Sequence, residues 1–254
     1  MEIRINKEKN IGNVLFVVEG EKTEFSILRR ILCNILGFTY IESRRNSPTK
    51  YINNNPNSCV AVINTRSSNI ASISDEEYLD DIFKELVEEY NYPIDKAAIY
   101  FVFDRDPQSN FCPNTFRNYI NLLQNPYENP NSLRAGQLLL SYPSVEAFRI
   151  SNFRNDSWTI QRGLGSELKE YISENSDIQI NKITEDTLKN ATFEFYQYVY
   201  KYEKQIDIDN FSQSSMKIFN SEEELYEEKK LYDLFSMLVL AFLQLGIIEV
   251  LNNN

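Results

Sequence analysis

The run Val14-Leu15-Phe16-Val17-Val18, followed at once by Glu19-Gly20, decides the fold class of this chain. Consecutive apolar residues rich in valine are typical of a strand that is buried on both faces of a parallel sheet. Gly20 ends the run, and apolar side chains then recur at helical spacing from Leu28 to Leu36, with Gly37 as the expected C-terminal stop. This pattern predicts a strand followed by a helix, the opening half of a parallel α/β unit.

Three further apolar runs predict strands of the same sheet, at residues 59–63, 98–103 and 137–140. Helical patterns lie between them. Ser74 and Glu77 have the spacing of a capping box, and the residues near 113–124 carry an apolar stripe. Residues 43–58 are rich in Ser, Asn and Pro and predict a loop. The expected fold is an α/β, Rossmann-like domain with a central, mostly parallel four-stranded sheet flanked by helices.

The pattern changes after Gly163, where strand signals become scarce and helical patterns rich in Glu, Tyr and Phe take over. We therefore predict an α/β domain over residues 1–160 and a C-terminal helical appendage over residues 161–254. Residues 234–248 carry no charge, but a membrane span needs about 20 such residues. A core helix or a partner-facing helix is the better interpretation, and no membrane association is expected. The Glu222-Glu223-Glu224 and Glu227-Glu228 runs predict a solvated helix face, and the alternative is a contact for a basic partner surface.

Composition excludes several classes of chemistry. The chain has no His, which rules out Ser-His-Asp triads, Cys-His pairs and His-based zinc sites. Its three Cys are far apart and form no CxxC pair, and the N-terminus is charged rather than an apolar leader. These features predict a cytoplasmic protein with reduced thiols.

The net charge is −11, so bulk charge does not favour binding to nucleic acid. Residues 1–65 are the exception, with nine basic and six acidic side chains. A nucleic-acid footprint would have to be small and local, with a shallow salt dependence. The candidate residues for it are Arg44, Arg45, Lys50 and Arg149; the alternative is that each basic cluster is a solvated surface.

Acidic residues follow the predicted strands. Glu19 comes directly after the first strand, Asp104 and Asp106 follow the third, and Glu146 opens the helix after the fourth. In an open parallel sheet the ligand crevice lies at the carboxyl ends of the strands. Alternation along an extended chain places Asp104 and Asp106 on one side, roughly 7 Å apart. Carboxylates so arranged suit Mg²⁺ or Mn²⁺, although acidic residues after strands are also common in turns.

The joint pattern resembles the Toprim domain, the metal-dependent module of topoisomerases, primases and several nucleases. The segment Val17-Val18-Glu19-Gly20-Glu21-Lys22-Thr23-Glu24 resembles the EGEKTE opening of the RloB/AbiL-type Toprim proteins, and Phe103-Asp104-Arg105-Asp106 resembles their FDRD segment. The segment from Leu140 to Phe148 is similar to a third motif that supplies a further acid, here Glu146, although Tyr142 and Val145 depart from it. The resemblance covers residues 11–155.

That resemblance implies a Mg²⁺-dependent nuclease that cleaves DNA or RNA. Asp104 and Asp106 would bind the metal, with Glu146 as a further ligand, and Glu19 would be a general base or a ligand. It also implies a phage-defence role beside a separately encoded ATPase of the ABC/SMC type. Lys22 at the start of the first helix either points at a phosphate or at the carboxylate cluster, as a catalytic residue would, or is a solvated surface residue. Two alternatives stay open: a catalytically silent Toprim-like scaffold that binds a partner, and a DxD nucleotide-sugar transferase, which leaves Glu19 without a role.

Overall fold

The computed structural model describes residues 1–41, 49–53, 57–65, 69–71, 83–84, 86–88, 92–93, 96–127 and 136–251 of the 254-residue chain. Its centre is one sheet with the strand order β11-β8-β6-β2-β5-β4-β3, and β7 pairs with β8 beside this path. The four adjacent strands β8, β6, β2 and β5 are parallel. Their bounds are β2 (Asn13–Val18), β5 (Ser58–Asn64), β6 (Ala97–Asp104) and β8 (Gly136–Tyr142).

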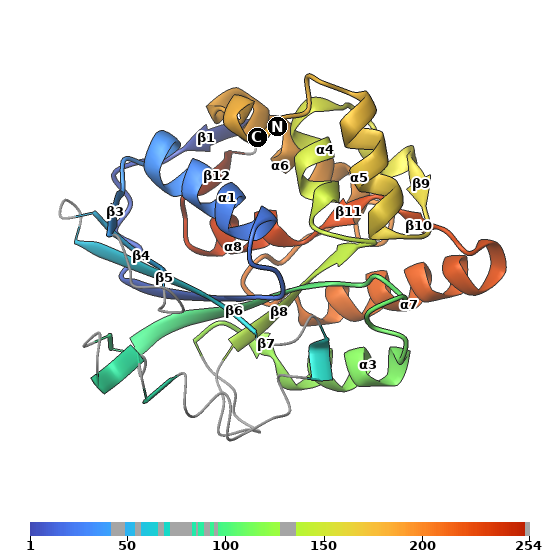
Figure 1. Cartoon of the computed structure of the whole chain (residues 1–254), viewed down its shortest axis with the longest axis horizontal. Helices are drawn as coiled ribbons and strands as arrows, with labels where there is room; N and C mark the ends of the chain where they lie inside the picture. Colours follow the sequence, from blue (N-terminus) through green and yellow to red (C-terminus); the bar gives the residue numbers. More distant parts are fainter. Residues whose placement is uncertain are drawn as a thin grey trace.

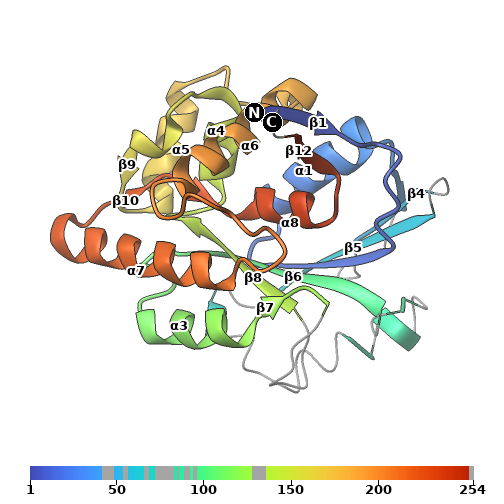
Figure 2. The ribbon, with the colours of Figure 1, turned by 180° about the vertical axis from the view of Figure 1, so that it is seen from behind.

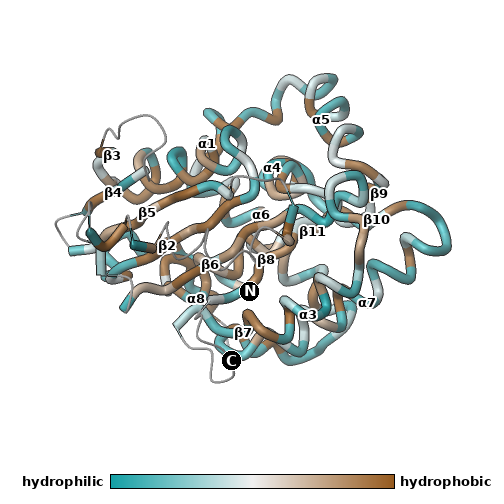
Figure 3. Tube along the Cα trace, turned by 60° about the horizontal axis from the view of Figure 1, so that its bottom comes forward, coloured by the Kyte–Doolittle hydropathy of each residue, from teal (hydrophilic) through white to brown (hydrophobic). Residues whose placement is uncertain are grey.

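These four parallel strands are the ones that the apolar runs predict. Each is almost fully buried, because helices cover the sheet on both faces. Figure 3 shows the hydrophobic colour concentrated along β2, β5 and β6, while the outer end of α7 (Ser212–Lys229) is hydrophilic. The chain is therefore an α/β protein with a mixed central sheet flanked by helices, compatible with a Rossmann-like arrangement.

The described sheet is larger than the four strands predicted, because short antiparallel strands extend it. They are β3 (Thr39–Ile41), β4 (Thr49–Asn53), β7 (Gln124–Asn125) and β11 (Phe235–Ser236). Strand β4 lies inside the segment predicted to be a loop, so that prediction is wrong at residues 49–53. Only Tyr51 of β4 is buried, and the strand exists because it pairs with β5. A strand with a single apolar anchor has too weak an alternation to be recognised.

Helices form a layer on each face of the sheet, as Figures 1 and 2 show from opposite sides. One face carries α1 (Thr23–Arg29), α4 (Glu146–Phe153), α5 (Gly165–Glu174), α6 (Glu185–Val199) and α8 (Leu238–Gln244). The other carries α3 (Pro113–Leu122) and α7. The helix predicted behind Ser74 and Glu77 falls largely outside the described residues.

Helix α1 shows why the apolar spacing was informative. It continues as a π-helix over Arg30–Ile35, and the predicted stripe, from Leu28 to Ile35, is buried against the sheet. Gly37 follows with φ +73°, a left-handed conformation that favours glycine after a helix. Local sequence therefore specifies both the buried face of this helix and its end.

The C-terminal residues share the core of the rest of the chain. Leu188, Phe195 and Ile218 belong to the same buried cluster as Val17 and Phe101. Strand β11 pairs with β8 inside the central sheet, and β12 (Ile248–Leu251) pairs with β1 (Glu2–Ile5), which brings the two termini together. This packing is more intimate than that of an appendage, and the domain boundary at residue 160 stays a prediction.

The uncharged segment 234–248 forms β11 and α8 and is buried almost throughout, as expected for a core element. None of the helices in the described ranges combines the length and the apolar character that a membrane crossing needs.

Candidate functional site

An acidic pocket opens at the carboxyl ends of β2 and β6, with a volume of about 430 Å³. Its lining includes Glu19, Lys22, Asp104, Asp106 and Glu146, so the structure brings together the catalytic and metal-binding residues that the sequence predicts. Further lining residues, which the sequence analysis did not assign to the site, are Gly20, Glu21, Thr23, Glu24, Ser109, Val145 and Lys169.

Strand pairing explains why Glu19 meets Asp104. Strands β2 and β6 run parallel with Val18 beside Val102, and the Glu19 N–H donates to the Val102 carbonyl over 3.1 Å. Glu19, the first residue after β2, therefore lies beside the C-terminal end of β6. Its carboxylate Oε2 accepts a hydrogen bond of 2.8 Å from the backbone N–H of Asp104. Glu19 and Asp104, which are far apart in the sequence, therefore lie next to each other at the floor of the pocket.

The two aspartates of the Asp-Arg-Asp segment are held by backbone amides at the starts of helices. Oδ1 of Asp104 accepts from the N–H of Val145, which precedes α4, over 2.8 Å. Oδ2 of Asp106 accepts from the N–H of Gly165, the first residue of α5, over 2.9 Å. An added Cβ at Gly165 would lie 2.8 Å from that oxygen, so the close approach depends on glycine. Helix N-termini carry partial positive charge and favour such carboxylates.

Glu146 reaches the pocket from the first turn of α4 and is only 2% exposed. Its Oε2 accepts from the Ser144 hydroxyl over 2.8 Å, and its Oε1 accepts from the Thr23 hydroxyl over 3.4 Å. Val145 occupies the N-cap position of α4, and the Ser144 hydroxyl makes no cap hydrogen bond but donates to Glu146. The hydroxyls of Ser144 and Thr23 therefore orient this acid.

Glu24 is an additional acid of the pocket, 5% exposed and on the first turn of α1. Its Oε1 accepts from the Gly20 N–H over 3.0 Å, and an added Cβ at Gly20 would lie 2.6 Å from Oε2. The four-residue spacing between Gly20, which follows Glu19, and Glu24 is the signal that could have identified it.

Burial and mutual repulsion raise the pKa values of the innermost acids. Burial, reinforced by Glu24 and Asp106, raises the pKa of Glu19 from 4.5 to about 8, although the hydrogen bond from Asp104 lowers it. Burial, followed by the charges of Glu19 and Glu24, raises the pKa of Asp104 well above its usual range. Burial likewise raises the pKa of Glu24. The fully ionised cluster is therefore unfavourable by itself, and a cation in the pocket would stabilise it.

Two lysines lie at the rim of the pocket. Lys22 is exposed at the N-cap position of α1, and Lys169 is exposed on α5. The charge of Lys169 lowers the pKa of Glu24, which places its ammonium within electrostatic reach of the acids. The pocket thus combines an acidic floor with a basic rim.

The residues predicted to bind nucleic acid are less clearly grouped. Arg44 and Arg45 lie outside the described residues. Lys50 is half-buried on β4, and Arg149 is half-buried on α4, where its Nη2 donates to the Ile178 carbonyl over 3.1 Å. Neither Lys50 nor Arg149 is among the described residues that line the pocket.

Within the described ranges, no three Asp, Glu or Cys side chains already have the spacing of a formed metal site. Mg²⁺ is commonly held by only one or two protein carboxylates, together with water and substrate phosphate oxygens.

Comparisons of the chain with protein-family models, with curated proteins and with solved structures find no match.

Proposed function

We propose that this protein is a Mg²⁺- or Mn²⁺-dependent nuclease of the Toprim type, which cleaves phosphodiester bonds in DNA or RNA. The observation that carries the proposal is the convergence of Glu19, Asp104, Asp106 and Glu146 on one pocket at the carboxyl ends of parallel strands. These acids follow three separate strands. A functional site requires them to share one pocket, whereas acids that serve only as turn residues have no reason to converge.

The donor set fits a hard divalent cation. The acidic floor offers carboxylate oxygens without imidazole or thiolate, which suits Mg²⁺ or Mn²⁺ and disfavours zinc. Asp104 and Asp106 would hold the ion, with Glu19 and Glu146 as further ligands. A bound cation would polarise the scissile phosphate and offset the negative charge that develops in the transition state.

The residues around the cation site have distinct roles in this proposal. Burial raises the pKa of Glu19 to about 8 in the metal-free protein, and a bound cation would favour its carboxylate form. That carboxylate would either complete the metal shell or accept a proton from an attacking water. Lys22 and Lys169, at the rim, are placed to contact the phosphate oxygens of a bound strand. These two contacts would orient the backbone over the acidic floor.

The nucleotide-sugar transferase alternative accounts less well for the pocket. A DxD transferase needs Asp104 and Asp106 but gives no role to Glu19, whose carboxylate accepts from the Asp104 backbone and lines the same pocket. The phage-defence role and the separately encoded ATPase rest on the resemblance to RloB/AbiL-type Toprim proteins.

The decisive experiment is a cleavage assay on duplex DNA, single-stranded DNA, RNA and tRNA, with Mg²⁺, Mn²⁺ or EDTA. We expect cleavage only with the metal, and none from Asp104→Asn. In parallel, Mn²⁺ should raise the melting temperature of the wild-type protein, because the folded state binds metal preferentially. Absence of both cleavage and metal stabilisation, also when the proposed ABC/SMC-type ATPase is supplied, would support the silent scaffold instead.

A further inference from the structure

Arg105, between the two aspartates of the pocket, points to the opposite face of the sheet. It is 2% exposed, and its Nε and Nη2 each donate to the Glu223 carboxylate over 2.7 Å. Glu223 lies on α7, which covers that face. A bidentate pair fixes the plane of the guanidinium as well as its position.

The surroundings of Arg105 tie this pair to the acidic turn. The guanidinium lies 4.9 Å from the Phe116 ring centre, and its Nη1 donates to the Asn110 carbonyl over 2.6 Å. Asn110 in turn donates from Nδ2 to the Asp104 carbonyl over 3.0 Å and from its backbone N–H to the Asp106 carbonyl over 2.9 Å. The guanidinium therefore holds the whole turn that carries Asp104 and Asp106.

Helix α7 is itself anchored next to this contact. Glu222 accepts from the Asp233 N–H over 3.0 Å and from the Tyr198 hydroxyl. Glu222 and Glu223 were expected on a solvated helix face, and this expectation is wrong, because they are 1% and 4% exposed. The exposed acids of that run begin at Glu224.

We propose that the Arg105–Glu223 ion pair is a positioning device that sets the orientation of Asp104 and Asp106 from the far side of the sheet. Replacing a buried ion pair with apolar residues of similar volume is often neutral or stabilising, so stability alone does not account for such a pair. The two hydrogen bonds between Arg105 and Glu223 fix one orientation of the backbone that carries Asp104 and Asp106, which apolar packing does not do. The importance of this orientation for cleavage rests on the proposed function.

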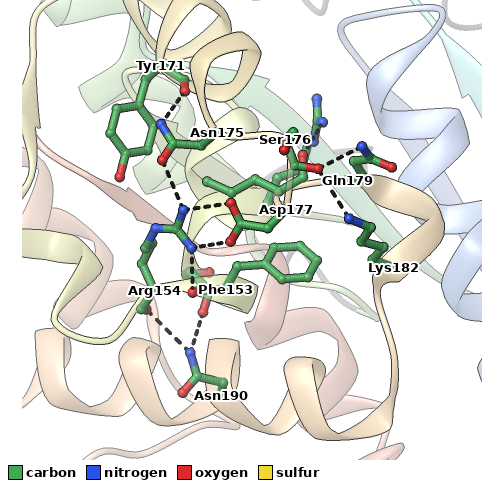
Figure 4. A network of polar contacts seen from close by, with 12 residues as sticks. Phe153, Arg154, Tyr171, Asn175, Ser176, Asp177, Gln179, Lys182 and Asn190 are labelled. Atoms are coloured by element: carbon green, nitrogen blue, oxygen red, sulfur yellow. Dashed lines mark hydrogen bonds and ion pairs between the residues drawn. The ribbon is translucent and has the colours of Figure 1, made fainter.

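The test uses the double variant Arg105→Met with Glu223→Leu, which removes the fork without leaving a lone buried charge. A matched control is Arg154→Met with Asp177→Leu, which removes another bidentate arginine–carboxylate pair, at the end of α4 (Figure 4). Neither Arg154 nor Asp177 lines the pocket.

The first readout is amide hydrogen exchange in the metal-free protein. The N–H groups of Val145 and Gly165 donate to the carboxylates of Asp104 and Asp106, so their protection reports directly where these acids point. In the double variant we expect these two amides to exchange at least about tenfold faster, while amides in β2 and β5 stay protected. The control variant should leave both amides unchanged.

The second readout is Mn²⁺ affinity, which we expect to fall by about 10- to 100-fold in the double variant, as is usual when groups behind metal ligands are lost. If the double variant keeps both the amide protection and the wild-type Mn²⁺ affinity, the pair is only a packing element and the proposal is wrong. If wild-type protein binds no Mn²⁺, the proposed function fails, but the exchange rates still decide whether the pair positions the acids.

Should the double variant not fold, Glu223→Gln takes its place, because glutamine keeps the shape and one acceptor oxygen. We expect the same two amides to lose protection to a smaller degree. Unchanged exchange at both of them in a folded Glu223→Gln protein would overturn the proposal.

Discussion

Two groups of buried acids lie on opposite faces of the same sheet. Above it, Glu19 and Asp104 form the floor of the pocket. They accept hydrogen bonds from backbone amides, and no buried cation of the described residues lines this pocket. Below it, Glu223 meets the guanidinium of Arg105, and Glu222 meets a tyrosine hydroxyl and a backbone amide. Burial raises the pKa of Glu19 and of Glu222 alike, in each case to about 8.

The two groups of acids differ in the source of the groups that neutralise them. The lower acids find their partners within the protein and have no opening to solvent, which is the arrangement of a structural network. The upper acids face a pocket of about 430 Å³ with lysines only at its rim. Acids that are equally buried therefore acquire different roles according to whether the protein itself supplies the neutralising group.

The largest effect should come from breaking the lower group. Arg105→Met alone leaves Glu223 buried without its cation, and we expect the free energy of unfolding to fall by about 3–5 kcal/mol. Urea denaturation followed by circular dichroism measures this loss. Arg154→Met, which breaks a partly exposed pair, should lower it by about 1 kcal/mol or less. Equal losses in the two variants would contradict the assignment of the lower group as structural.

Removing a charge from the upper group, the acids of the pocket, should affect activity strongly and stability little. We expect Asp104→Asn to reduce metal-dependent cleavage by at least about 100-fold, since loss of a direct ligand exceeds loss of a supporting group. Stability of the metal-free protein should stay the same or rise, because one member of a repelling cluster is gone. Cleavage rates and urea denaturation of the same preparation provide both numbers. Full activity would remove Asp104 from the mechanism.

Glu19 should also make the stability of the protein depend on pH. The folded state raises the pKa of Glu19 from 4.5 to about 8, so it binds this proton more tightly than the unfolded chain. The resulting stabilisation is present below pH 4.5 and is lost as the pH rises through about 8. In the metal-free protein we expect Glu19 to contribute a loss of about 3 kcal/mol between pH 5.5 and 9.

Glu19→Gln is the control for this contribution, because it cannot ionise. It should reduce the pH dependence without abolishing it, since Glu222, with a pKa of about 8, titrates in the same range. Asp177, whose pKa Arg154 lowers to about 2, titrates below this range and does not interfere. A wild-type stability that rises with pH across the same range would contradict the assignment of a raised Glu19 pKa.

The smallest effect should come from the rim. We expect Lys169→Ala and Lys22→Ala each to weaken substrate binding by about tenfold and to reduce the salt dependence by roughly one phosphate contact. Lys96→Ala, at the start of β6 and thus at the other end of the sheet, should change neither quantity. Fluorescence anisotropy with a labelled single strand at several salt concentrations measures both. Identical behaviour of the three variants would show that the rim lysines do not contact the backbone.

The local sequence was sufficient to predict the central strands and the first helix. The four parallel strands and the stripe of α1 follow from apolar runs and helical spacing, which depend only on near neighbours. It was also sufficient to place Glu19, Asp104, Asp106 and Glu146 in one pocket, because parallel strands bring their carboxyl ends to one edge.

Tertiary structure decided the rest, because the deciding partners are distant in sequence. Strand β4 depends on its pairing with β5, and Lys169 enters the pocket only because α5 begins at the carboxylate of Asp106. The contact between Arg105 and Glu223 spans 118 positions. A buried charge is tolerated only where a specific partner meets it, and no local pattern in a single sequence names that partner.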